Sequence, residues 1–170
     1  MTRRTSVTVL AGAAALVLTL AIAGCGGSNN TATPTTANGS AATIGVANDN
    51  LGDVLVNSQG RTLYLFQKDS GTKSACTGAC AAAWPPLRAN GKPTVGNGAD
   101  ASLVGTTPRS DGKPEVTYNG HPLYLFVKDQ KAGDTNGEGV NAFGGSWYAV
   151  SPAGDQVSAP PANPGGGYGY

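Results

Sequence analysis

The heptapeptide Leu63–Asp69, Leu-Tyr-Leu-Phe-Gln-Lys-Asp, recurs sixty positions later at Leu123–Asp129 as Leu-Tyr-Leu-Phe-Val-Lys-Asp. Ten of the 26 positions from 44 to 69 are identical to the positions sixty residues further on, which indicates an internal duplication. Beyond the shared aspartate each copy reaches a tryptophan, Trp84 in the first and Trp147 in the second. Two copies are too few for a solenoid, so we expect the two halves to pack on each other.

The apolar residues of both copies are arranged as short strands with turns between them. In the first copy a polar turn separates Val54–Val56 from Thr62–Phe66. In the second copy Asn119-Gly120 separates Val116–Tyr118 from Pro122–Val127. Asn-Gly between apolar runs is a strong hairpin signal because both residues tolerate a positive φ.

A further hairpin is predicted at Asp111-Gly112, which would pair Leu103-Val104 with Glu115-Val116. The sequence favours helix only near Ala79–Ala83, for a turn or two ended by Pro85-Pro86. The predicted fold is therefore mainly β: duplicated small β-hairpin-rich repeats packed into one domain.

The faces of the repeated strand are both apolar. In an extended chain Tyr64 and Phe66 share one face, while Leu63 and Leu65 share the other. We therefore expect the strand to be central and covered on both sides.

The aspartate of the repeat has two interpretations. Asp69 follows Tyr64 by five positions, about 16 Å along an extended strand, so the two cannot bond within one copy. In the first interpretation Asp69 closes a turn through its own backbone. In the second, Tyr64 meets Asp129 and Tyr124 meets Asp69 across a pseudo-twofold axis.

Both elements fit the pattern Tyr-x-(Phe/Trp/Tyr)-x-x-Asp. Its residues are Tyr64, Phe66 and Asp69 in one copy and Tyr124, Phe126 and Asp129 in the other. The chain thus resembles the bacterial secreted-repeat lipoproteins, which carry this pattern in tandem. The resemblance implies a location and a fold, and it implies no reaction.

The beginning of the chain predicts export. Arg3 and Arg4 precede an apolar stretch that ends in small residues, which is typical of a signal peptide over residues 1–24. Ile22–Cys25, Ile-Ala-Gly-Cys, resembles the bacterial lipobox. This implies cleavage before Cys25 and lipid on its thiol, so we expect an extracytoplasmic protein anchored to the bacterial cell membrane by lipidated Cys25.

Composition divides the remaining chain into three parts. Residues 25–42 hold the lipidated cysteine and a flexible tether without large apolar side chains, and residues 158–170 form a Pro/Gly-rich tail. The duplicated β domain is expected over 43–157, with repeat one at about 43–88 and repeat two at about 101–157.

Charge excludes one class of partner. The 170 residues carry a formal net charge of +1, and only 12% of them are charged. Removal of residues 1–24 leaves nine basic and ten acidic side chains, a net charge of −1. We therefore expect no nucleic-acid partner. The membrane is the expected partner, through the lipid anchor, and any other envelope partner stays open.

Cys76 and Cys80 are predicted to form a disulfide, the default for two cysteines in an exported protein. A metal site formed by Cys76, Cys80 and His121 is the alternative, although a fourth ligand is missing. The loop beginning Asp134–Gly139 resembles the first half of a calcium loop but lacks the glutamate that closes one. We expect neither a metal nor a cofactor.

No catalytic residue is assigned. The single histidine, His121, follows a turn and belongs to no Ser/His/Asp or Cys/His pattern. We expect a non-catalytic envelope protein that binds or scaffolds. An envelope redox or metal-handling factor is the alternative, and an extracellular hydrolase using Asp69 and Asp129 is a further one.

Overall fold

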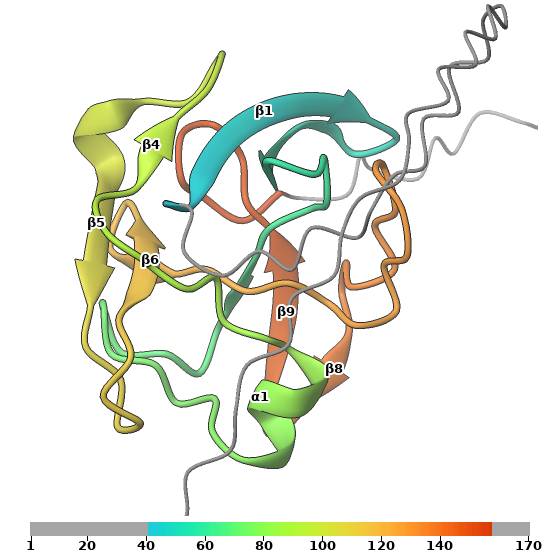
Figure 1. The fold of residues 1–170 in the computed structure, drawn as a ribbon. Helices are drawn as coiled ribbons and strands as arrows, with labels where there is room; N and C mark the ends of the chain where they lie inside the picture. Colours follow the sequence, from blue (N-terminus) through green and yellow to red (C-terminus); the bar gives the residue numbers. More distant parts are fainter. Residues whose placement is uncertain (1–40, 158–170) are drawn as a thin grey trace, which may run out of the picture. The chain divides into compact units, whose positions relative to one another are not determined.

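The computed structural model describes residues 41–157, which hold nine strands, one helix and one 3₁₀ turn (Figure 1). The elements are β1 (Thr43–Asp49), β2 (Gly52–Asn57), β3 (Tyr64–Phe66), α1 (Ala79–Ala83), β4 (Thr94–Val95), the 3₁₀ turn (Ala101–Leu103), β5 (Val104–Thr107), β6 (Glu115–Tyr118), β7 (His121–Pro122), β8 (Asn141–Ala142) and β9 (Gly145–Ala149). The predicted signal peptide, Cys25 and the tail at 158–170 lie outside the described residues.

The strands form three small sheets with the orders β2-β1-β4, β3-β9-β8 and β5-β6-β7. All neighbours are antiparallel except β1 and β4, which are parallel. The mainly β prediction is confirmed, and α1 occupies the stretch predicted as helical. Within residues 41–157 no helix is long and apolar enough to cross a membrane.

The turn at Asn119-Gly120 is confirmed, whereas the register of the hairpin before it is not. Asn119 and Gly120 have φ angles of 46° and 80° and join β6 to β7. In the preceding hairpin Val104 pairs with Tyr118, so the expected pairing of Leu103-Val104 with Glu115-Val116 is wrong. Prolines at 108 and 114 lack an N–H and end the ladder, which leaves a longer loop around Asp111-Gly112.

The first-copy hairpin is also smaller than expected. Val56 and Thr62 form an isolated bridge, and the N–H of Leu63 donates to the carbonyl of Leu55 at 2.9 Å. β2 pairs instead along its whole length with β1, a strand that the sequence pattern did not mark. β3 turns away to pair with β9 from the second copy.

Each copy completes its Tyr-Leu-Phe strand with the segment after the other copy's tryptophan. Leu65 pairs with Tyr148 in the β3–β9 ladder. The equivalent contact is a hydrogen bond of 2.9 Å from the N–H of Leu125 to the carbonyl of Pro85. Proline has no N–H to return, so this second pairing stays irregular. The strand predicted over Pro122–Val127 is for this reason regular only at β7.

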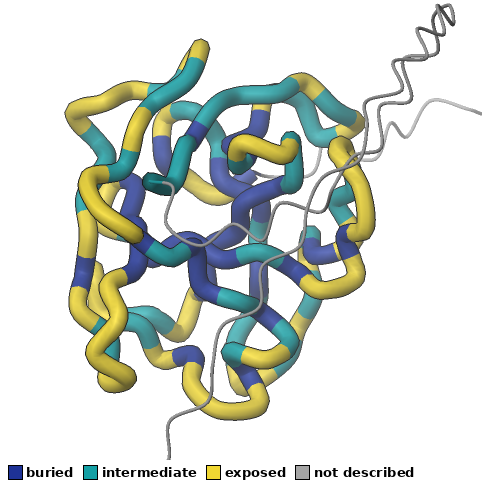
Figure 2. The backbone as a smooth tube through the Cα atoms, viewed as in Figure 1, coloured by how far each residue is buried: buried dark blue, intermediate teal, exposed yellow. Residues whose placement is uncertain are grey.

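The two faces of the repeated strands lie in different apolar clusters, which confirms that these strands are covered on both sides. Tyr64 and Phe66 belong to a cluster with both tryptophans, and Leu63 and Leu65 belong to a second cluster. Buried stretches lie toward the middle of the described residues and exposed ones toward the rim (Figure 2). Residues 41–157 lie within one compact unit, which contains both clusters, the disulfide and every strand pairing of the described residues.

Gly137 permits the closest approach of a loop to the first cluster. A Cβ atom at this position would lie 2.7 Å from Tyr64 Cζ and 2.9 Å from Trp84 Cη2. Both rings are buried and held by neighbours, so they cannot yield to an added methyl group.

We predict that Gly137→Ala lowers the free energy of unfolding by about 2 kcal/mol through overpacking. Gly45→Ala is the matched control, because its Cβ would meet only Asn97 O at 4.0 Å, and it should change stability by less than about 0.5 kcal/mol. Chemical denaturation of the two variants measures both values. Equal stabilities would contradict the close packing of the loop.

Candidate functional site

Two tyrosine–aspartate pairs join the copies. The hydroxyl of Tyr64 donates to Asp129 Oδ2 at 2.7 Å, and the hydroxyl of Tyr124 donates to Asp69 Oδ2 at 2.8 Å. Each tyrosine therefore finds its aspartate in the other copy, and the predicted cross-copy pairing is confirmed.

A pseudo-twofold axis passes between the two tyrosines. The N–H of Tyr64 donates to the carbonyl of Tyr124 at 2.9 Å, and the N–H of Tyr124 donates back to the carbonyl of Tyr64 at 2.9 Å. Such an exchange defines a hydrogen-bonded antiparallel pair, in which the two residues are equivalent. The backbone thus pairs the two repeat motifs with each other in antiparallel orientation.

The aspartates also close their own loops. Asp69 Oδ1 accepts from the N–H of Ala75 at 2.7 Å, and Asp129 Oδ1 accepts from the N–H of Asn136 at 3.0 Å. Each aspartate therefore both closes a loop of its own copy and bonds to the tyrosine of the other copy, as the two interpretations proposed separately. The loops are wider than the turn that the first interpretation implies. Every oxygen of the two carboxylates accepts a hydrogen bond from the protein.

The phenylalanine of each motif stacks on the tryptophan of the other copy, and the tyrosine of each motif meets its own copy's tryptophan edge-on. Neighbouring ring centroids in the stack are 3.9 to 4.0 Å apart, in the order Phe66, Trp147, Trp84 and Phe126. Tyr64 meets Trp84 edge-on at 5.4 Å, and Tyr124 meets Trp147 edge-on at 5.1 Å. All six rings are buried, so the motif residues form the core of the domain.

Burial controls the protonation of this core. It raises the pKa of Tyr64 and of Tyr124, and the neighbouring carboxylate raises each further, so both phenols stay neutral donors. Burial also raises the pKa of Asp69, while the N–H of Ala75 and the hydroxyl of Tyr124 oppose this rise.

A polar network that the sequence did not predict extends from Tyr124. Its hydroxyl lies 2.7 Å from Ser74 Oγ, which accepts from Arg109 Nη1 at 2.7 Å. Arg109 Nη1 also donates to Glu115 Oε2 at 2.7 Å, and its other amino group donates to the carbonyl of Cys76. Arg109 and Glu115 are 4% and 0% exposed, so this is a buried ion pair beside the disulfide.

Within this network only Glu115 stands out in the sequence, because it is the one charged residue of an otherwise uncharged strand, β6. Arg109 and Ser74 come from loops, and no spacing rule connects them to Glu115. Glu115 Oε1 has no hydrogen-bond partner among the described residues. Burial raises the pKa of Glu115 to about 7, although the charge and hydrogen bond of Arg109 oppose this rise.

The disulfide between Cys76 and Cys80 is present. It fixes the connection between the Asp69 loop and α1, and both sulfurs are used in it. The alternative in which these cysteines bind a metal with His121 therefore lacks its thiolates. No cluster of three or more metal-ligating side chains exists within residues 41–157.

Asp69 and Asp129 lie in separate environments. Asp69 lines a pocket of about 310 Å³ together with His121 and Asp155, and Asp129 is not part of its lining. Asp129 is 2% exposed and lies against the loop that contains Asn136. Asp69 and Asp129, the pair that the hydrolase alternative requires in one pocket, therefore do not share this one.

These features define a class: a duplicated, mainly β domain whose two copies interlock through mutual Tyr–Asp pairs. The family model described as a secreted repeat of unknown function matches residues 45–88 and again 105–151. The chain belongs to this family of secreted repeats, and the family name indicates an extracytoplasmic protein. Comparison with curated proteins gives no match, and comparison with solved structures gives none either.

A double-mutant cycle tests the cross-copy pairing. Tyr64→Phe leaves a buried carboxylate oxygen of Asp129 without its donor and should lower the free energy of unfolding by about 2 kcal/mol. Combined with Asp129→Asn, its effect should be non-additive by about 1 kcal/mol or more. Combined with Asp69→Asn in its own copy, the effects should add to within about 0.5 kcal/mol. Coupling to Asp69 in place of Asp129 would refute the pairing.

The pKa of Glu115 predicts how stability depends on pH. Its folded pKa of about 7 lies above its ordinary value of 4.5, so protonation favours the folded state. The contribution is complete below pH 4.5 and is lost as pH rises to about 7, by up to about 3 kcal/mol. The pKa of Asp111 is lowered to about 2, so its titration changes stability only at pH values below this window.

Denaturation midpoints measured between pH 4.5 and 7.5 should therefore fall with rising pH in the parent protein. Glu115→Gln removes this titrating group and should reduce the slope, whatever its effect on absolute stability; Asp69 and Glu138, whose pKa values burial also raises, account for the slope that remains. Parallel curves for the two proteins would show that Glu115 is not the source.

Proposed function

We propose that the chain is a lipid-anchored, non-catalytic binding protein on the outer face of the bacterial cell membrane. The observation that carries this proposal is that the residues of the repeat motif are buried and fully hydrogen-bonded. Tyr64 and Tyr124 are fully buried, and the partner carboxylates accept hydrogen bonds at every oxygen. Residues held in this way stabilise a domain, and the binding role then falls to its surface.

The anchor rests on the sequence before the domain. Arg3 and Arg4, the apolar stretch and the lipobox-like Ile22–Cys25 direct lipid to the thiol of Cys25. Several acyl chains on one residue hold a protein firmly, whereas a single chain gives marginal binding. The tether that follows would hold the domain away from the bilayer.

Detergent phase partitioning of the full chain expressed in a bacterium tests the anchor. The parent protein should enter the detergent phase and carry the added mass of the lipid, whereas Cys25→Ser should lose both properties. The double variant Cys76→Ser/Cys80→Ser is the control and should partition like the parent, because those sulfurs are joined within the domain. Retention of Cys25→Ser in the detergent phase would contradict the anchor.

A further inference from the structure

The segment that joins the two copies forms a cavity with no counterpart in the repeats. The cavity measures about 490 Å³ and lies between β4 and β5. Most of its lining comes from residues 91–104, between the matched ranges 45–88 and 105–151. Its volume falls in the range of small-molecule sites, roughly 300 to 1,000 Å³.

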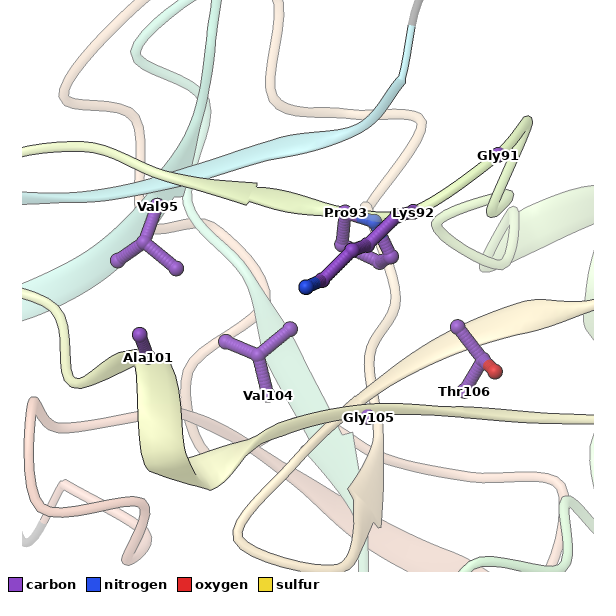
Figure 3. Close-up of a pocket in the computed structure, with 8 residues that line it drawn as sticks. All are labelled: Gly91, Lys92, Pro93, Val95, Ala101, Val104, Gly105 and Thr106. Carbon is purple, nitrogen blue, oxygen red and sulfur yellow. The ribbon is translucent and has the colours of Figure 1, made fainter.

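Two facing walls of the cavity carry apolar side chains. Val95 pairs with the buried Ile44 across β1 and β4, and Val104 pairs with the buried Tyr118 across β5 and β6. Their side chains extend into the cavity from opposite sides, and Ala101 closes one end (Figure 3). Apolar walls open to water favour an apolar occupant, because its burial releases water from both surfaces.

The rim carries one charge. Lys92 is the only charged residue in the lining, and its side chain extends from beside Pro93 toward the two valines (Figure 3). It forms no ion pair within the part of the chain that the structure describes. Thr106 adds a hydroxyl on the β5 side. The lining therefore presents one cation and one hydroxyl above an apolar space.

We propose that this cavity binds an amphipathic carboxylate with a hydrocarbon chain, that is, a fatty acid. The chain lies against Val95, Val104 and Pro93, and the carboxylate pairs with the ammonium of Lys92. The lining contains no acidic side chain that would repel such a headgroup. This inference rests on the proposed binding role and names its ligand class, and it is independent of the lipid anchor.

Isothermal titration of residues 37–170 with decanoate tests the assignment. The parent unit should bind decanoate and should show no binding of decyltrimethylammonium, which has the same chain and a cationic head. Lys92→Gln should weaken decanoate binding about 5- to 10-fold. Lys131→Gln removes an exposed lysine outside the cavity and should leave the affinity within about twofold.

A second variant tests the apolar part of the site. Ala101→Trp places a large ring at the end of the cavity and should abolish binding, while circular dichroism confirms that the unit stays folded. Absence of decanoate binding, equal affinities for the parent and Lys92→Gln, or equal binding of the cationic amphiphile would each overturn the ligand assignment. The partitioning of Cys25→Ser is measured separately, so failure here leaves the anchor intact.

Discussion

The exchange of backbone hydrogen bonds between Tyr64 and Tyr124 fixes the relation between the copies. In a hydrogen-bonded antiparallel pair the two side chains lie on the same face, so both tyrosines point into the same cluster. Strand alternation then places Phe66 and Phe126 on that face and the flanking leucines on the other. The aromatic stack, the two Tyr–Asp pairs and the second apolar cluster all follow from this one contact.

The contact also explains why the unit is a pair of copies. A tyrosine cannot reach the aspartate of its own copy along an extended strand, and β3 finds its neighbour, β9, in the second copy. One copy alone would leave a phenol, a carboxylate and a strand edge without partners, each at a cost in free energy. Because both copies belong to one chain, each copy finds these partners at a high effective concentration and without a second molecule.

Much of this arrangement could be predicted from the sequence, because a repeat with period-two apolar residues constrains both faces of a strand. A distance argument on Tyr64 and Asp69 excluded a bond within one copy and left the cross-copy pairs as one of two interpretations. The hairpin register at Asp111-Gly112 could not be predicted, since two prolines widened the loop. The Arg109–Glu115 pair was also missed, because an ion pair between a loop and a strand start leaves no periodic signal.

Two features of the domain depart from the symmetry of the repeats. Each motif residue has an equivalent partner across the axis, so changing one breaks a contact that the domain needs, and the motif is held for stability. The disulfide at Cys76 and Cys80 and the cavity lined by residues 91–104 have no such equivalent. A segment without a symmetric counterpart is free to vary its lining while the duplicated core stays unchanged. The duplicated core is thus held rigidly by its own contacts, and the joining segment is where we propose that a ligand binds.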